Sequence, residues 1–201
     1  MTSTQLYYFL FSGLVTYAGF ALYLRNLRKF RDMHVSVISW LVWLFAEITN
    51  FVTCVLDVGF HEWPRLIFPA LNALATGAIV LTAIRRKMYD SLTSVDAIIL
   101  ILVMVGFGYL LYTGDTEHTS LFVLLAISMG YFVTAWGILK GELHERPIPW
   151  LIVCGGATLA LVGYSENEVH GVVRHFSAVA VCGEGGVFLS IIIKSAFRNR
   201  R

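Results

Sequence analysis

Two acidic side chains lie deep inside apolar stretches of this sequence, where an ionised group is costly. Glu47 stands about 11 residues into an apolar run that begins near residue 36, and Glu184 stands about 11 residues into one that begins near residue 173. At that depth in a bilayer a charged side chain should face protein or a wet cavity. Each carboxyl group can therefore bind a solute or a proton, or it can be a protonated group that only joins two helices by a hydrogen bond.

Further polar and aromatic side chains accompany these two carboxyl groups. Positions three or four residues apart lie on one face of a helix, and this spacing places two side chains beside Glu47 and one beside Glu184. Another apolar run carries an Asn and a Thr one turn apart. The candidate solute-binding residues are Glu47, Glu184, Asn72, Trp43, Asn50, Thr76 and Ser177.

The two carboxyl groups are expected at the same depth of a membrane and in different halves of the chain. If both point into one interface, repulsion between like charges would favour a proton or a cationic solute between them. This arrangement suits proton coupling or a cationic substrate better than it suits a neutral sugar. For each residue the alternative remains that it serves helix packing alone.

No motif for catalysis, cofactor binding or metal binding accompanies the candidate residues. Cys54, Cys154 and Cys182 fall within apolar runs and are expected to be packing residues. The six histidines show no metal-ligand spacing, and the sequence lacks a nucleophile elbow, a P-loop, a dinucleotide fingerprint and an HExxH motif. We therefore expect no enzymatic activity, no cofactor and no metal. The basic runs are short and indicate topology and contact with anionic lipids, not nucleic-acid binding.

The composition predicts that membrane helices position these residues. Only 14% of the residues are charged and 57% are hydrophobic, whereas a soluble domain carries about 25% charged residues. No alternation of period two indicates a barrel, and each apolar run is long enough to cross a bilayer as a helix. We predict a single all-α transmembrane domain with seven helices, at 5–24, 36–57, 65–84, 95–113, 119–139, 147–164 and 173–194.

The distribution of positive charge predicts the orientation. Of the 15 Lys and Arg residues, all but Arg65 and Arg174 fall in alternate loops or the C-terminal tail. By the positive-inside rule the N-terminus should lie outside and the C-terminus in the cytoplasm. The first run has no basic segment before it and no small-residue cleavage site after it, so we expect a retained helix and not a signal peptide.

The first and last thirds of the sequence resemble each other. The segment from Gly19 to Trp40 and the segment from Gly130 to Trp150 each read as an apolar helix end, a basic loop and a Trp, about 110 residues apart. We predict two parallel three-helix repeats, 5–86 and 119–196, with the helix at 95–113 as a linker between them. Many transporters place their substrate site between such repeats.

This layout resembles the SWEET and PQ-loop superfamily of seven-helix membrane proteins. The basic segment 22–32 and the following 35–40, with its Ser and Trp, are similar to the first repeat of that superfamily. Pro69 and Asn72 resemble a Pro and an Asn in its third helix. The Pro-Gln pair is absent, because Leu22-Tyr23 and Val133-Thr134 stand near its two positions. Val181 is the nearest counterpart of Asn72 in the last helix.

The resemblance implies a small-solute transporter that works by alternating access between the repeats. The chain is most similar to a prokaryotic branch, so we expect a multi-pass protein of a prokaryotic cell membrane. Its expected partners are the lipid bilayer and a small polar solute, with a homo-oligomer left open and no nucleic acid. The alternative is a non-transporting receptor or scaffold of the same fold, because fold alone does not choose a function.

Overall fold

The computed structural model describes residues 2–30, 33, 35, 37–88, 93–164 and 171–198. Several expected loop and tail cations, among them Arg31, Arg200 and Arg201, lie outside these residues. The elements in chain order are α1 (Ser3–Lys29), α2 (Val37–Val58), the short 3₁₀ helix η1 (Phe60–Glu62), α3 (Trp63–Arg85), α4 (Ser94–Thr113), α5 (Thr116–Lys140), α6 (Pro147–Gly163) and α7 (Gly171–Arg198). The expected all-α class is confirmed.

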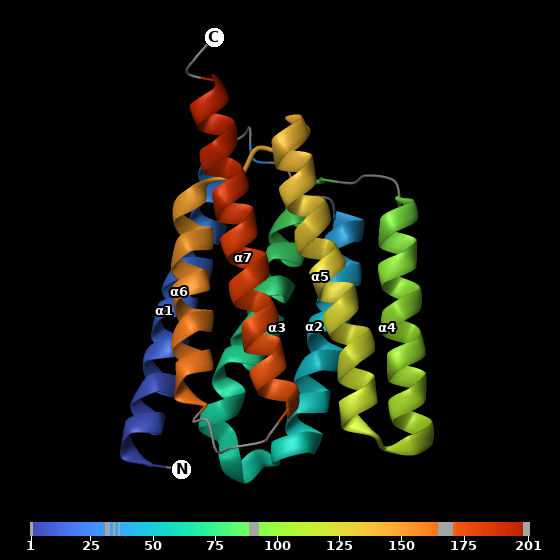
Figure 1. The fold of residues 1–201 in the computed structure, drawn as a ribbon. Helices are drawn as coiled ribbons and strands as arrows, with labels where there is room; N and C mark the ends of the chain where they lie inside the picture. Colours follow the sequence, from blue (N-terminus) through green and yellow to red (C-terminus); the bar gives the residue numbers. More distant parts are fainter. Residues whose placement is uncertain are drawn as a thin grey trace.

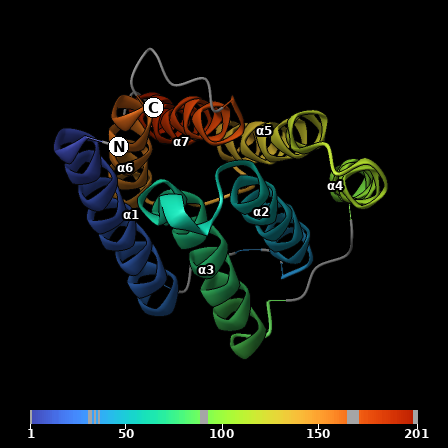
Figure 2. The same ribbon diagram turned by 90° about the horizontal axis from the view of Figure 1, so that it is seen from below.

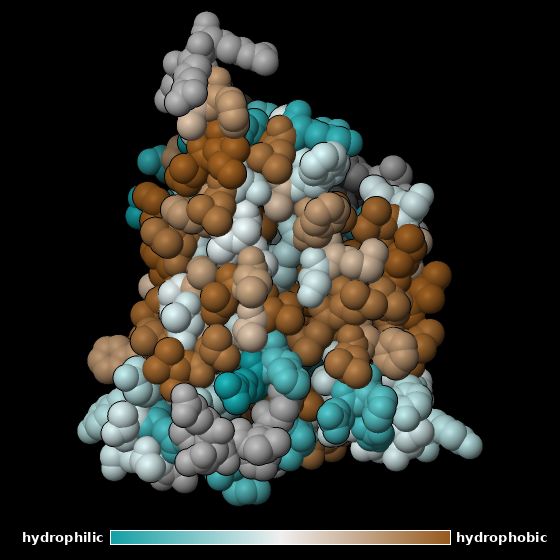
Figure 3. Space-filling model, in the orientation of Figure 1, coloured by the Kyte–Doolittle hydropathy of each residue, from teal (hydrophilic) through white to brown (hydrophobic). Residues whose placement is uncertain are grey.

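The helices have the length and apolarity of membrane spans. In the part of the chain that the structure describes, six helices are long and apolar enough to cross a membrane, and α6 is a shorter apolar helix of 17 residues. That length is the lower limit for a spanning helix. On the face seen in Figure 3, apolar side chains form a band across the middle of the molecule, with hydrophilic residues gathered towards both ends. The chain is thus a helical, multi-pass membrane protein.

Local signals in the sequence set where several helices begin and end. The Thr2 hydroxyl accepts from the backbone N–H of Gln5 at 3.3 Å, and the Gln5 side chain accepts from Thr2 N–H at 2.8 Å. Thr93 and Asp96 form the same reciprocal cap at the start of α4. Such caps satisfy backbone donors that have no partner inside the helix. Gly114 ends α4 with a φ of 68°, a left-handed conformation that favours glycine.

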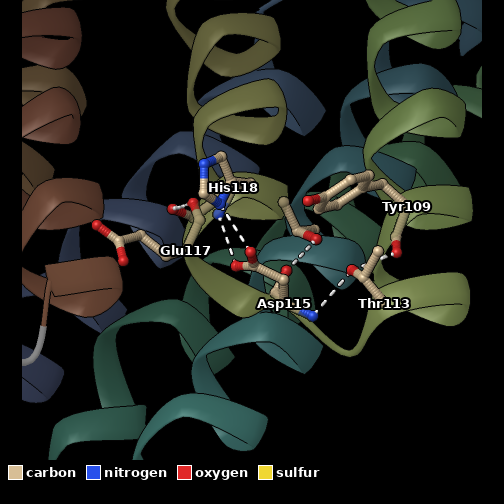
Figure 4. A network of polar contacts seen from close by, with 7 residues as sticks. Tyr109, Thr113, Asp115, Glu117 and His118 are labelled. Atoms are coloured by element: carbon tan, nitrogen blue, oxygen red, sulfur yellow. Dashed lines mark hydrogen bonds and ion pairs between the residues drawn. The ribbon is translucent and has the colours of Figure 1, made fainter.

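The turn between α4 and α5 is held by a small polar network (Figure 4). Asp115 accepts hydrogen bonds from the backbone N–H of His118 at 3.1 Å and interacts with its ring Nδ1 at 2.7 Å. The hydrogen bond from the His118 backbone is the main cause that lowers the pKa of Asp115 below its ordinary value. Because this network is exposed and caps a helix, its role is structural.

The helices pack as two groups of three with one helix at the edge. Helix α3 lies between α1 and α2, and α7 lies between α5 and α6. The groups meet where α1 runs along α6 and where α2 packs against α5. Within the described residues α4 contacts only α2 and α5, and it stands at the edge of the bundle (Figures 1 and 2).

The long contact between α1 and α6 depends on small residues. Ser12 Oγ donates a 2.8 Å hydrogen bond to the backbone oxygen of Gly156. A side chain on Gly156 would collide with Thr16, and one on Gly19 would collide with Val153. Small residues let membrane helices approach closely, because packing drives their association in lipid.

The two ends of the bundle differ in charge. We call the end where α1, α3, α5 and α7 finish the basic end; it lies at the top of Figure 1, with the C-terminus. The opposite end, which we call the acidic end, carries Asp57, Glu62, Asp115 and Glu117. At the basic end Arg86 donates to the backbone oxygens of Leu27 and Phe30 and so ties α3 to the end of α1.

Candidate functional site

A narrow cavity lies in the middle of the bundle and is lined by every long helix except α4. It leaves about 20 Å³ for the centres of water molecules, which is room for about one water. Five of the seven candidate residues line it, namely Trp43, Glu47, Asn72, Thr76 and Glu184. They come from α2, α3 and α7, so the cavity joins the two groups of helices.

Glu47 and Glu184 are the two acidic groups of this cavity. Their exposed fractions are 2% and 1%, and they are close enough to act on each other electrostatically. One oxygen of each carboxyl group, Oε2, has no hydrogen-bond partner among the described residues. The other oxygen of Glu184 accepts a hydrogen bond from the Tyr131 hydroxyl at 3.2 Å. Because buried polar atoms normally have partners, these oxygens are suited to bind a proton or a cationic group.

Trp43 and Asn72 supply further polar atoms at the cavity. The Trp43 side chain lies within interaction range of Glu47, but its indole N–H makes no hydrogen bond of normal geometry to any described residue. The Asn72 amide nitrogen donates to the backbone oxygen of Phe68 at 3.0 Å, one turn earlier in α3. This bond fixes the amide and leaves its oxygen as the atom that a solute could contact.

Asn50 and Ser177 do not reach the cavity. Asn50 is fully buried one turn further towards the acidic end, where its side-chain oxygen accepts a weak contact from the Cys54 thiol at 4.0 Å. Ser177 donates to the backbone oxygen of Val173 at 3.1 Å, within its own helix. The structure therefore does not bring these two candidates together with the other five. Both residues lie on the expected faces of their helices. At their positions along the bundle, however, these faces are buried against neighbouring helices.

An aromatic cluster that no sequence motif indicated lies on the basic side of the cavity. Trp40 and Trp150 are buried, with exposed fractions of 9% and 7%. Trp40 stacks on Trp43 with ring centroids 5.0 Å apart. Tyr23 and Tyr131 complete the cluster, at 5.9 Å and 6.4 Å from the Trp150 ring. The sequence shows how far along its helix a Trp lies. It does not show which side of that helix packs against a neighbouring helix.

Glu145 holds this cluster together from the loop before α6. It accepts one hydrogen bond from the Tyr23 hydroxyl at 2.9 Å and one from the Trp150 indole N–H at 3.3 Å. Burial raises the pKa of Glu145 to about 7, although both hydrogen bonds act in the opposite direction. Nothing in the loop sequence marked this carboxyl group, because it resembles an ordinary solvated residue beside Arg146.

A second aromatic contact lies between the level of the cavity and the acidic end. Phe68 and Phe176 are buried, and their ring centroids are 5.4 Å apart. Phe68 precedes Asn72 by one turn of α3, and Phe176 precedes Glu184 by about two turns of α7. Aromatic side chains from the two groups of helices therefore lie on both sides of the cavity along the bundle.

A larger hollow of about 480 Å³ lies between α2, α4 and α5 at the basic end. Trp40 and Trp43 line both this hollow and the central cavity, and Glu145 also borders the hollow. The stacked Trp pair thus forms the wall between them. A movement of that pair would join the cavity to the basic end of the molecule.

No group of three or more His, Cys, Asp and Glu residues that could hold a metal ion occurs in the described ranges. Comparisons with family models, curated proteins and solved structures found no match to this chain.

Proposed function

We propose that this chain is a membrane transporter for a small polar solute that is cationic or that moves together with a proton. The observation that carries this proposal is the pair of buried carboxyl groups, Glu47 and Glu184, on one cavity between two groups of helices. Each group keeps one oxygen without a partner among the described residues. Two such groups side by side favour positive charge between them.

The proposed architecture is SWEET-like, with parallel repeats at 5–86 and 119–196 and a linker helix at 95–113. The order of packing supports it, because the third helix is central in each group and α4 belongs to neither group. The proposed orientation, with the N-terminus outside and the C-terminus in the cytoplasm, rests on the positive-inside rule. We propose a prokaryotic cell membrane as its location, because the chain resembles a prokaryotic branch of that superfamily that lacks the Pro-Gln pair.

In the proposed cycle the two groups of helices rock against each other around the cavity. The aromatic cluster with Glu145 is the gate on the cytoplasmic side, and the contact of Phe68 with Phe176 is the gate on the outer side. Because the cavity holds about one water, we interpret this arrangement as the state of the cycle in which both gates are closed. Opening the inner gate would connect Glu47 and Glu184 to the hollow beside Trp40 and Trp43.

A non-transporting receptor or scaffold is the second candidate. It is favoured by α1 and α5, which run for 27 and 25 residues without an internal proline, so neither helix has the hinge that a proline provides. Against it stands the cavity at mid-depth, lined by both groups, since a receptor needs polar groups open to one side only. The two candidates differ in whether a solute crosses the membrane.

The test uses the full chain in liposomes that contain a pH-sensitive dye. A panel of small amines, amino acids and neutral sugars is added outside, and internal pH and solute uptake are measured. We expect uptake of an amine or amino acid that depends on pH, and we expect the substitutions E47Q and E184Q to abolish that pH dependence while the protein stays folded.

The matched control is E117Q, which removes an exposed carboxyl group at the acidic end. It should leave uptake unchanged. Uptake by E47Q and E184Q with the pH dependence of the wild type would disprove the role of the two carboxyl groups. Binding of a panel member to the wild type without any uptake would support the receptor instead.

A further inference from the structure

A groove of about 680 Å³ lies on the surface of the bundle between α1 and α3. Both helices lie at the periphery of the molecule (Figure 2). Small side chains at Ala21, Ala75 and Ala78 form much of its floor, and Tyr17 and Leu74 border it. The groove is separate from the central cavity, although Phe20 lines both.

The groove is charged at one end only. Arg25, Arg28 and Lys29 line it at the basic end, and all three side chains are exposed. Among the described residues no carboxylate forms an ion pair with Arg25, Arg28 or Lys29, and the Lys29 ammonium lies 5.4 Å from the centroid of the Phe30 ring. Arg86, in contrast, donates hydrogen bonds to the backbone oxygens of Leu27 and Phe30 at the end of α1. Three cations thus face the groove with no anion of the described chain to neutralise them.

The dimensions of the groove match one leaflet of a bilayer. From Tyr17 to Lys29 the helix rises by about 18 Å, and half of the hydrocarbon core of a bilayer is about 15 Å. The cations lie in the last two turns of α1, where the apolar band gives way to polar surface. Guanidinium and ammonium groups at this level attract phosphate groups of anionic lipids.

We propose that this groove binds one anionic phospholipid from the leaflet at the basic end. The lipid phosphate lies among Arg25, Arg28 and Lys29, and one acyl chain lies along the alanine floor. Charge complementarity selects the headgroup, and the apolar groove distinguishes a lipid from a free phosphate ion. The bound lipid would fill the outer side of the contact between α1 and α3.

The test is native mass spectrometry of the full chain in detergent, titrated with phosphatidylglycerol or with phosphatidylcholine. We expect one tight phosphatidylglycerol adduct on the wild type and weaker binding of phosphatidylcholine. The double substitution R25Q/R28Q should weaken phosphatidylglycerol binding about 30-fold, since each cation near a membrane surface contributes about 1 kcal/mol. Filling the floor with A21L/A78L should weaken it without any change of charge.

The matched control is R85Q/K140Q, which removes two cations from the same end of the bundle outside the groove. It should keep the tight adduct, and melting temperatures should show that all variants are folded. An equal loss in this control would mean diffuse attraction and would overturn the proposal. Displacement of the lipid by millimolar inorganic phosphate, or a dimer that A21L/A78L converts to a monomer, would overturn it as well.

Discussion

Tyr131 shows how one side chain can prepare the cavity for its ligand. Its hydroxyl donates the hydrogen bond that fixes Glu184 Oε1, and its ring packs at 5.1 Å from that of Trp43. Gly183 makes room for this ring, because any side chain there would collide with it. Tyr131 therefore connects the acidic groups of the cavity to the aromatic gate.

The first prediction concerns this hydroxyl group. Y131F leaves a second oxygen of Glu184 without a partner, which should cost about 1–3 kcal/mol of the free energy of unfolding. Unfolding in a denaturing detergent measures it. Y112F, at a tyrosine that is 92% exposed, is the matched control and should have no effect. If Y131F destabilises the protein equally in an E184L background, the hydrogen bond is not the cause.

The second prediction concerns Glu145, whose pKa of about 7 lies above its ordinary value because of burial. The folded protein then binds this proton more tightly than the unfolded chain does. The resulting stabilisation is complete below the ordinary carboxyl pKa and is lost as the pH rises through about 7. Melting temperatures of the wild type should therefore fall between pH 5 and pH 8 by more than those of E145Q.

The neighbouring substitution E142Q is the control for that experiment, because Glu142 is exposed in the same loop. It should keep the pH dependence of the wild type. Identical pH profiles for E145Q and the wild type would show that Glu145 does not titrate in this range. In that case the loop that carries Glu145 would not be a pH-sensitive part of the inner gate.

At the scale of elements, the sequence predicted the helices closely. The run predicted at 147–164 is helix α6, Pro147–Gly163, and the one predicted at 95–113 is helix α4, Ser94–Thr113. Apolarity and helix caps are local properties, so a single sequence contains them. Helix α1 extends to Lys29, beyond the predicted residue 24, because its last polar turn leaves the apolar band and packs near α3.

The third prediction tests the contact between α1 and α6. G156L should lower the free energy of unfolding by about 1–3 kcal/mol, since the larger side chain has no space beside Thr16. G108L is the matched control, because nothing lies within 4 Å of a side chain built at this helical glycine. Equal effects of the two substitutions would show that the close contact between α1 and α6 does not determine the loss, since leucine favours the helix more than glycine does at both positions.

At the scale of the whole molecule, only part of the site could be predicted. Glu47, Glu184 and Asn72 were identifiable because polar groups in apolar runs are conspicuous. Tyr131 and Glu145 were not, because their roles depend on which neighbour each helix face meets. Asn50 and Ser177 share the predicted faces but lie where the bundle is closed. Helix periodicity gives a face, whereas the contact pattern decides how far along that face a cavity extends.

The fourth prediction is the topology of the whole chain. Single cysteines at Thr116 and at Ser91, in a background without the three native cysteines, should be labelled by impermeant reagents from outside and from inside respectively. Thr116 begins α5 at the acidic end, and Ser91 lies outside the described residues. Labelling of both from the same side of intact cells would contradict the seven-span arrangement.

The packing of α1 against α6 and of α2 against α5 has a consequence for biosynthesis. Glu47 leaves the ribosome about 140 residues before Glu184, which at 5–20 residues per second is roughly 7–30 s. During this interval the first three helices are in the membrane without the helices that cover their polar faces. The nascent chain must therefore be shielded by the insertion machinery, or held with Glu47 protonated, until α7 has been made. A ribosome that stalls after α3 would release a fragment with an uncovered acidic face, which is a ready substrate for membrane quality-control proteases.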